Sequence, residues 1–471
     1  MTVIKADICV IGAGSGGLSV AAGAAQLGAR TVLIESGKMG GDCLNTGCVP
    51  SKSLLSAAKA RAHALEADRL GIMVRDARPD FSRVMDHVHG VIAAIEPHDS
   101  VERFEGLGVT VLQDHARFVD RKTVVAGGVT VRARRFVVAT GSTAMVPPIP
   151  GLSETPFLTN ESVFELEDLP QHLIVIGGGP IGVELSQAFQ RLGSEVTLFE
   201  GRQLLAKDDP ELVEIVRQQL LADGVDLREG EAVESVGAYD GGISVSIQGK
   251  GTLQGSHLLV AAGRQPNVDD LGLEEAGVAY SDRGIKVDAR LRTSNKKIFA
   301  IGDVTGGLQF THVAGYHAGI VIRNALFRVP AKADHSAVPW VTYSDPELAH
   351  VGMSEAEARK AHGRKVRVVR WPFAENDRAM AEGDTRGLIK VIVGPKGRIL
   401  GASLVGAGAG ETIQPWILAL SQGMKIGAFT SIIAPYPTRG EISKRVAGDY
   451  YTPTLFSPKT RILVRLLSLL G

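Results

Sequence analysis

The hydrophobic pattern near the N-terminus predicts a strand, a glycine-rich turn, a helix and a second strand. A short apolar run at residues 8–11 leads into a G-x-G-x-x-G sequence made by Gly12, Gly14 and Gly17. An alanine-rich segment then has the composition of a helix, and a second apolar run ends at Glu35. Short buried runs on either side of a helical segment are typical of a βαβ unit.

The same pattern occurs a second time, with Gly177, Gly179 and Gly182 followed by an acid at Glu200. Each of these residues lies 165 positions after its counterpart, as in 177 − 12 and 200 − 35. Such glycines allow a tight turn and let a pyrophosphate approach a helix N-terminus, while the acid suits a ribose hydroxyl. The repeat therefore predicts two dinucleotide-binding sites.

Length and charge narrow the class of protein further. The 471 residues are enough for roughly three domains. Because 51 basic side chains balance 51 acidic ones, no basic field is available to attract nucleic acid. No apolar run reaches the ~18–20 residues of a membrane span, and the first residues lack the regions of a signal peptide. We expect a soluble, cytoplasmic enzyme without a metal site.

Two cysteines, Cys43 and Cys48, follow the first unit in the stretch G-G-D-C-L-N-T-G-C-V-P-S-K. A disulfide between them would close a very small loop and would stabilise the fold little. A C-x4-C pair alone is more often chance or half a metal site. Beside a dinucleotide unit, with Pro50 opening a helix, it predicts a redox-active dithiol. Cys9, in an apolar run, is expected to be a buried strand residue, so cysteine usage fits a reducing compartment.

Together these features resemble the class I pyridine nucleotide–disulfide oxidoreductases, such as dihydrolipoamide dehydrogenase, glutathione reductase and mercuric reductase. The chain also has A-T-G-S at 139–142, A-A-G-R-Q-P-N at 261–267 and A-I-G-D at 300–303, and from residue 338 onward it is similar to the family's interface domain.

The resemblance implies an α/β fold with two Rossmann-like dinucleotide-binding domains, for FAD and NAD(P), and a C-terminal α+β dimerisation domain. The implied boundaries are 1–146 and 271–335 for the FAD domain, 147–270 for the NAD(P) domain and 336–471 for the dimerisation domain. A homodimer that shares its active sites between subunits is also implied.

Site residues follow from the resemblance by matching position. Cys48 would face the flavin as the charge-transfer thiolate, and Cys43 would exchange with substrate. Lys52 and Glu184 match the pair beside flavin N5, although composition alone would make them solvated helix residues. The implied FAD contacts are Gly12, Gly14, Gly17, Glu35, Lys52, Ala116, Gly141, Ser142, Gly302, Asp303 and Ala314. The implied NAD(P) contacts are Gly177, Gly179, Gly182, Glu184, Glu200, Val233 and Gly263.

Glu200 favours NAD(H) over NADP(H). A carboxylate at this position accepts a hydrogen bond from a 2′-hydroxyl and repels a 2′-phosphate, whereas NADPH-specific relatives have an arginine there. Arg202 lies close enough in the sequence to keep NADP(H) open as the alternative.

The chain departs from the family pattern near its C-terminus. Where the family has its catalytic His in H-P-T-x-x-E, this chain has Tyr436, with Glu441 retained. A phenol, with a pKa of about 10 against about 6.5 for imidazole, is a poor proton acceptor at neutral pH, which makes fast turnover of free dihydrolipoamide doubtful. His312 is an alternative base, although a structural role is the favoured interpretation. Mercuric reductases share the Tyr, but their C-terminal cysteine pair is missing here.

The leading hypothesis is an FAD-dependent NAD(P)H:disulfide oxidoreductase, most like dihydrolipoyl dehydrogenase, acting on a small-molecule or lipoyl-type disulfide or dithiol. The alternatives are a mercuric-reductase-like metal reductase and a flavoprotein that donates electrons to a membrane or carrier partner. The last rests on the apolar stretch 461–470 with its two arginines, for which packing against the dimer partner is favoured over a surface-lying amphipathic helix. The physiological substrate and the direction of catalysis stay open.

Overall fold

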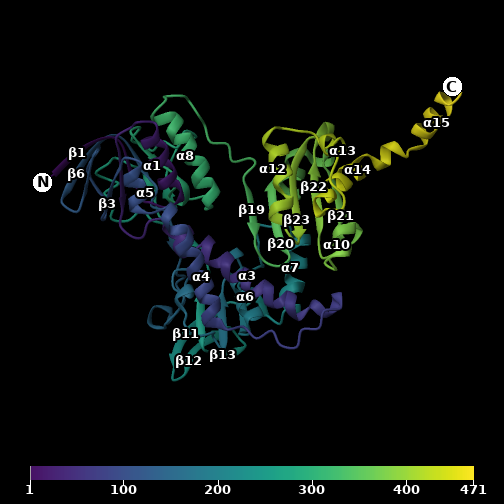
Figure 1. Ribbon diagram of the computed structural model, residues 1–471, viewed down its shortest axis with the longest axis horizontal. Helices are drawn as coiled ribbons and strands as arrows, with labels where there is room; N and C mark the ends of the chain where they lie inside the picture. The colour runs from purple at the N-terminus through teal and green to yellow at the C-terminus, as the bar shows by residue number, and fades with distance from the viewer. Residues whose placement is uncertain (1, 471) are drawn as a thin grey trace. The chain divides into compact units, whose positions relative to one another are not determined.

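The computed structural model describes residues 2–470, which form two compact units (Figure 1). The first unit holds the described residues up to Arg61, then Arg78–Gly201 and Gly230–Asp334. The second holds Ala62–Ala77, Arg202–Glu229 and the described residues from His335 onward. The first unit thus contains both dinucleotide patterns, and the domain boundaries given above remain predictions.

A seven-stranded sheet in the first unit grows from the first βαβ pattern. Its parallel strands run in the order β3-β2-β1-β6, with β18 beside β6, and β5 and β4 extend it in antiparallel fashion. Helices α1 and α8 pack side by side on it (Figure 1). The bounds are β1 Thr2–Ile11, α1 Ser15–Gln26, β2 Thr31–Glu35, β3 Val109–Gln113, β4 Arg117–Asp120, β5 Thr123–Ala126, β6 Val129–Val138, β18 Ile298–Ala300 and α8 Thr311–Ala325.

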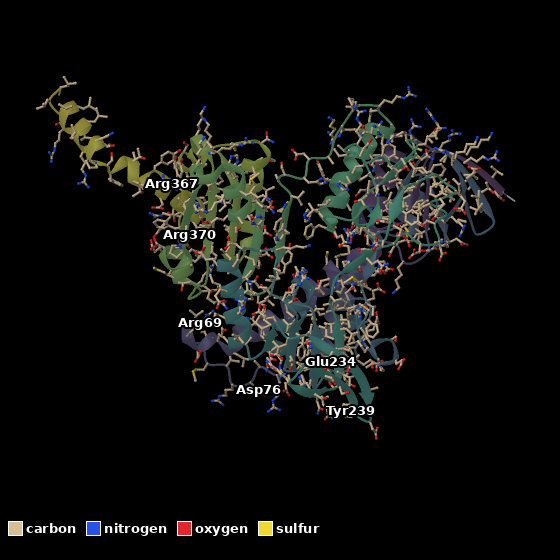
Figure 2. All side chains as sticks on the ribbon, turned by 180° about the vertical axis from the view of Figure 1, so that it is seen from behind. Arg69, Asp76, Glu234, Tyr239, Arg367 and Arg370 are labelled. Carbon is tan, nitrogen blue, oxygen red and sulfur yellow. The ribbon has the colours of Figure 1, made fainter. Side chains whose placement is uncertain are left out.

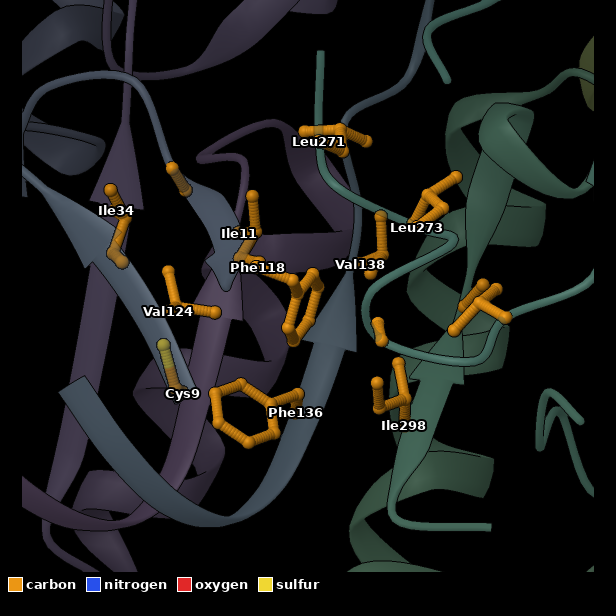
Figure 3. Close-up of a cluster of buried hydrophobic side chains, with 14 of the residues drawn as sticks. Cys9, Ile11, Ile34, Phe118, Val124, Phe136, Val138, Leu271, Leu273 and Ile298 are labelled. Carbon is orange, nitrogen blue, oxygen red and sulfur yellow. The ribbon is translucent and has the colours of Figure 1, made fainter. Parts of the chain in front are cut away.

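Figure 3 shows the hydrophobic cluster of this sheet, to which β18 returns from a distant part of the chain. Cys9 is fully buried there, beside Phe136 and Val124, so its predicted place in a buried strand is confirmed. The rings of Phe118 and Phe136 meet edge to face, with centroids 5.2 Å apart. A thiol enclosed in this way has no access to substrate, which leaves the other two cysteines for chemistry.

The second glycine pattern forms a second parallel arrangement, in which β8 lies between β9 and β14. Helix α6 begins 165 residues after α1, and β9 ends 165 residues after β2, so the repeat in sequence is a repeat in structure. An antiparallel sheet of β11, β12 and β13 completes this region. The bounds are β8 His172–Ile176, α6 Pro180–Leu192, β9 Glu195–Glu200, β11 Val233–Tyr239, β12 Gly242–Ile247, β13 Gly251–Gly255 and β14 His257–Val260.

The second unit is built on a five-stranded antiparallel sheet, in the order β19-β20-β23-β22-β21. Trp416 fills its core, stacks on Phe429 with ring centroids 3.9 Å apart, and donates a hydrogen bond to Ser443. On β21, Arg367 lies over the Tyr450 ring while Arg370 pairs with a glutamate of α7 (Figure 2). The bounds are α7 Pro210–Ala222, β19 Pro339–Thr342, β20 Glu347–Gly352, β21 Arg367–Pro372, β22 Leu388–Val393, β23 Ile399–Gly406, α12 Gln414–Ser421 and α14 Ile442–Leu455.

Shorter elements complete the two units. They are α2 Gly41–Asn45, α3 Cys48–Leu65, α4 Phe81–Ile95, α5 Val101–Gly106, β7 Ser142–Ala144, β10 Asp226–Glu229, β15 Arg264–Pro266, β16 Tyr280–Ser281, β17 Gly284–Ile285, α9 Glu355–His362, α10 Asp377–Ala381, α11 Ala409–Thr412, α13 Gly427–Thr430 and α15 Pro458–Leu467. Within residues 2–470, no helix is both long enough and apolar enough to cross a membrane.

Candidate active site

The two glycine turns have the same geometry. Gly12 and Gly177 adopt positive φ angles of 100° and 115°, which side chains of other residues rarely tolerate. A Cβ atom on Gly17 would lie 1.8 Å from the carbonyl oxygen of Gly12, and one on Gly182 would lie 1.8 Å from that of Gly177. The first and third glycines of each motif are therefore required by backbone packing within the turn.

The middle glycine of each motif leaves a helix N-terminus accessible. Gly14 and Gly179 are the N-cap residues of α1 and α6, and no other part of the described chain comes within 4 Å of where their Cβ atoms would be. Neither of these two described helices has a side-chain N-cap hydrogen bond. The first-turn N–H groups and the helix dipole thus fit a pyrophosphate at each site.

An acid at the end of a strand is held over each turn. Glu35 accepts hydrogen bonds from the amides of Ala13, at 2.5 Å, and Gly37, at 2.7 Å. Glu200 accepts one from the Gly178 amide at 2.8 Å. The carboxylates of both dinucleotide units therefore have matching positions, as their predicted role toward a ribose requires.

A polar cluster surrounds Asp303, which the resemblance places near the flavin. The Ser142 hydroxyl donates to Asp303 at 2.7 Å and accepts from the guanidinium of Arg264 at 2.8 Å. Arg264 is only 12% exposed and also lies 3.2 Å from Asp42, in the dithiol segment. Burial raises the pKa of Asp303, and the bonds to Ser142 and Arg264 partly offset that rise. Sequence reasoning omitted Arg264, although it is the arginine of A-A-G-R-Q-P-N.

Helix α8 positions the other side of this region. The Gly302 amide donates to the ring of buried His317 at 3.2 Å. A Cβ atom on Gly302 or on Gly16 would lie 3.1 Å or 3.2 Å from the side chain of Ala314. This close packing explains small residues at all three positions, whereas His317 carries no sequence signal because it lies outside the recognised motifs.

The dithiol lies where α2 ends and α3 begins. All three cysteines in residues 2–470 are free, with Cys43 half-buried and Cys48 exposed at the start of α3. The hydrogen bond from Cys43 lowers the pKa of Cys48 to about 6, helped by Thr311 and the charge of Lys52 against the effect of burial. The Thr311 hydroxyl lies 3.5 Å from the Cys48 sulfur.

The two thiols are therefore electrostatically different. The same hydrogen bond, together with burial and the nearby Cys48 charge, raises the pKa of Cys43. In the reduced pair, Cys48 holds the thiolate and Cys43 holds the proton, which is the asymmetry that the resemblance implied. Thr311 was missed by sequence reasoning because its partner lies 263 residues away.

Lys52 and Glu184 form an ion pair of 2.7 Å. Lys52 lies one helical turn after Cys48 on α3, while Glu184, on α6, has a side chain that is only 5% exposed. The pair thus joins the dithiol helix to the helix of the second glycine motif. The expectation from composition that both are solvated residues does not hold for Glu184, because burial of a carboxylate requires a partner.

Tyr436 and Glu441 lie in the second unit and have separate partners. The phenol of Tyr436, which is 69% exposed, donates to Asp377 at 3.0 Å, and this bond raises the pKa of Tyr436 above its usual value. Glu441 accepts from Arg445 at 3.1 Å. His312, in the first unit, is exposed and stacks on Phe310 with ring centroids 5.2 Å apart. The geometry gives Tyr436 the properties of a proton donor and of a poor base.

The remaining predicted contacts are spread over the first unit. Ala116 is buried in the sheet core, and Val233 is half-buried at the start of β11. Gly141 and Gly263 have positive φ angles of 70° and 134°. Among residues 2–470, no group of three or more His, Cys, Asp or Glu is arranged to hold a metal ion.

Comparison with known proteins identifies the class. Residues 6–318 match the pyridine nucleotide-disulphide oxidoreductase family, and residues 338–447 match the dimerisation domain of that family. The chain therefore belongs to the pyridine nucleotide–disulfide oxidoreductases.

Individual relatives agree with this assignment. A mercuric reductase of Staphylococcus aureus is 35% identical over 94% of this chain and 82% of its own length. A dihydrolipoyl dehydrogenase of the same species is 35% identical over 94% of this chain and 96% of its own. The Cu(II) complex of the HOCl-induced flavoprotein disulfide reductase RclA from Escherichia coli superimposes with a TM-score of 0.86 at 30% identity. That match covers 94% of this chain and 99% of RclA.

The protein is thus an FAD-dependent disulfide oxidoreductase that uses FAD and NAD(P)H. The predicted family, enzyme class, cofactors and α/β fold with a dimerisation domain are confirmed, and the dimerisation domain supports the predicted homodimer. The glycine turns, uncapped helix N-termini and strand-end acids described above fit these cofactors. The roles of individual residues remain predictions.

Proposed function

We propose that this enzyme uses NADH to reduce acceptors that need no proton transfer from the protein, above all disulfides whose thiols leave as stable thiolates. Lipoyl-type disulfides would be slow members of the same substrate class. The observation that carries the proposal is the pairing of Tyr436 with Asp377, which leaves no imidazole at the family's proton-transfer position.

The first glycine motif, Glu35 and the Ser142–Asp303 cluster would hold FAD, and the second motif with Glu200 would hold NADH. When bound, FAD would take up the hydride from NADH and supply the electron pair that reduces the Cys43–Cys48 disulfide. Lys52 would lie beside it, held by its 2.7 Å ion pair with Glu184. The carboxylate of Glu200 favours NADH because it would repel a 2′-phosphate.

Reduction of the active-site disulfide takes up two electrons and one proton and gives the Cys48 thiolate and the Cys43 thiol. Passage of the Cys43 proton along its bond to Cys48 would make Cys43 the nucleophile. Cys43 would attack one sulfur of the substrate, form a mixed disulfide and release the first product thiolate. Cys48 would then attack Cys43, release the second thiolate and restore the disulfide.

The leaving thiolate decides which substrates are fast. An imidazolium can protonate a thiolate as it leaves, but a phenol whose pKa is raised by Asp377 is a much weaker acid. Departure without a proton is easy only when the product thiol has a low pKa. The same transition state is crossed in dithiol oxidation, so that reaction should be limited by the supply of substrate thiolate.

A series of disulfides with product thiols of graded pKa tests the proposal. With NADH at pH 7, kcat/KM should rise steeply as the pKa of the leaving thiol falls. Tyr436→His should flatten this dependence by speeding the high-pKa disulfides, whereas the matched control Tyr436→Phe should resemble the parent enzyme. Equal kcat/KM for lipoamide and an aromatic disulfide in the parent enzyme would contradict the proposal.

A thiol-bound metal ion is the second candidate acceptor. It is favoured by the likeness to mercuric reductases and to a reductase whose structure is a Cu(II) complex, and metal reduction needs no proton acceptor at Tyr436. Against it, the sequence has no cysteine after Cys48. NADH oxidation that depends on Hg(II) or Cu(II) in excess thiol, and that Cys43→Ser abolishes, would support this candidate. No stimulation above the metal-free rate would remove it.

A cytoplasmic location is part of the proposal. A dithiol centre that cycles with NADH requires the nucleotide pool and the reducing conditions of the cytoplasm, and the three cysteines include no pair suited to a structural disulfide. Fractionation of cells, followed by detection of the protein, tests this point.

A further inference from the structure

We propose that α15 docks this enzyme on the surface of a membrane that contains anionic phospholipid. The proposal concerns the C-terminal segment 456–470, which lies beyond residues 338–447 that match the dimerisation domain. It goes beyond the redox function and does not depend on it.

The apolar side of α15 is open in the described chain. None of the residues in Pro458–Leu467 is buried. Its large apolar side chains are 53–60% exposed, and Leu469 and Leu470 beyond the helix are 81% and 83% exposed. Figure 1 shows the helix extending away from the sheet of its own unit, past the end of α14. A soluble protein rarely leaves so many neighbouring apolar side chains in water without a partner.

The helix is amphipathic, with the two sides clearly separated. At 3.6 residues per turn, Ile462, Leu463, Leu466 and Leu467 fall on one side, whereas Arg461 and Arg465 share the other. Such an arrangement suits a helix that lies in the plane of an interface, with leucines in the acyl region and arginines at the headgroups.

The charge of this segment is of one sign. Residues 456–470 contain three basic side chains, Lys459, Arg461 and Arg465, and no acidic one, although the whole chain has equal numbers of each. A cationic stretch on a neutral protein is complementary to an anionic lipid surface. A second copy of the chain would offer the same cations, and two such helices facing each other would repel.

The helix is built to stand without a protein partner. Ser457 caps its N-terminus by accepting from the Thr460 amide at 3.2 Å, and Pro458 occupies its first turn. The Thr460 hydroxyl donates to the carbonyl of Thr454 at 2.8 Å, which ties α15 to the end of α14. The exposed Phe456 lies at this junction and adds an aromatic anchor of the kind found at membrane interfaces.

The dimensions favour lying on a bilayer over crossing it. Ten helical residues span about 15 Å, roughly half of the ~30 Å hydrocarbon thickness. Within residues 2–470, no helix qualifies as a membrane span. Docking would therefore be peripheral and reversible, and would hold the reductase near acceptors at the membrane.

Co-sedimentation of the purified, FAD-loaded dimer with vesicles tests the proposal. The protein should bind vesicles of phosphatidylcholine mixed with phosphatidylglycerol, and bind pure phosphatidylcholine far less. Arg461→Gln with Arg465→Gln should weaken binding about 25-fold, because each cation contributes roughly fivefold near an anionic surface. Leu463→Ser with Leu467→Ser should weaken it about 100-fold through lost apolar burial. The exposed pair Arg364→Gln and Lys365→Gln is the matched charge control and should bind like the parent.

Oligomeric state, measured in parallel by sedimentation velocity, identifies the competing occupant. The leucine variant should remain dimeric and keep its bound FAD, which would leave the vesicle result as a direct reading of α15. Dissociation of the dimer by the leucine substitutions would mean that a second copy covers this face, and would overturn the proposal. Failure of the parent protein to bind anionic vesicles would overturn it as well.

Discussion

At the scale of single residues, the properties of Cys48 depend on a hydroxyl that is remote in sequence. Thr311 lies 3.5 Å from the Cys48 sulfur and helps to lower the pKa of that thiol to about 6. Because the folded pKa is depressed, the thiolate is present above about pH 6 and is lost as pH falls through that value. The bond therefore determines the lowest pH at which reduced enzyme keeps its thiolate.

Thr311→Val should raise the pKa of Cys48 by about 1 unit, since a hydrogen bond to a charged group contributes about 1.5 kcal/mol and 1.36 kcal/mol corresponds to one unit. Anaerobic titration of the reduced protein, followed through thiolate absorbance, measures the shift. Ser56→Ala, on the same helix as Cys48, is the control and should titrate like the parent. An unchanged midpoint in the Thr311 variant would assign the low pKa to Cys43 and Lys52 alone.

Tyr436 makes a second prediction at this scale. Dihydrolipoamide oxidation should climb with pH toward the pKa of the substrate thiol, without a bend near neutrality, because the phenol accepts no proton in that range. Tyr436→His should introduce a plateau near pH 7 and a faster rate there, within the 10²–10⁴-fold range typical of general acid–base catalysis. Unaltered rate and pH profile in a folded, dimeric variant would mean that another group handles the proton.

Glu200 makes a third. Glu200→Ala removes the carboxylate held at 2.8 Å by the Gly178 amide. KM for NADPH should fall and KM for NADH should rise, with kcat changed little, because binding of the ribose is uniform between ground and transition states. Steady-state kinetics with both nucleotides and a fixed disulfide test this. A parent enzyme that already prefers NADPH would contradict the assigned role of Glu200.

At the scale of elements, the two strand–turn–helix units are the same device used twice. Each bears a third glycine whose Cβ atom would lie 1.8 Å from a carbonyl oxygen of its own turn. The similarity extends to the uncapped N-termini of α1 and α6 and to the acids at the ends of β2 and β9. Substitutions in the two units should therefore have parallel effects on two different cofactors.

Gly17→Ala should abolish stable FAD binding, whereas Gly182→Ala should leave FAD bound and abolish NADH binding. Flavin absorbance after gel filtration and NADH titration separate the two outcomes. Gly23→Ala, further along α1 with open space around its Cβ position, is the control. It should retain FAD and gain up to about 1 kcal/mol of stability from helix propensity. Retention of FAD by the Gly17 variant would mean that the turn relaxes.

At the scale of the whole molecule, the ion pair between Lys52 and Glu184 joins parts of the chain 132 residues apart. It links the dithiol helix to the nicotinamide-side helix, so each dinucleotide unit helps to position the other. Lys52→Met should destabilise the fold by about 2 kcal/mol, because buried Glu184 loses this charged hydrogen bond. Thermal denaturation measures the loss, and Lys52→Arg should recover part of it. A melting temperature equal to the parent's would contradict a structural role for the pair.

The sequence by itself determined what depends on neighbouring residues. The glycine turns, the helices after them and the strand-end acids are local features, because their steric and dipolar requirements act within about 25 residues, and a repeat at a constant offset of 165 made them legible. The dithiol was equally readable, since both cysteines lie in one short stretch. Burial of Cys9 followed from an apolar strand that is enclosed on both faces.

The tertiary structure alone decided which cysteine holds the negative charge and which distant side chains surround the site. Thr311, Arg264 and His317 come from segments far from their partners, and no periodicity or spacing encodes such contacts. The partner of Tyr436 is also a tertiary matter: retention of Glu441 suggested the family's pairing, but the fold brings Asp377 to the phenol instead. Proton affinities are set by the groups that folding brings within a few ångströms, so chemistry of this kind is decided only once the chain has folded.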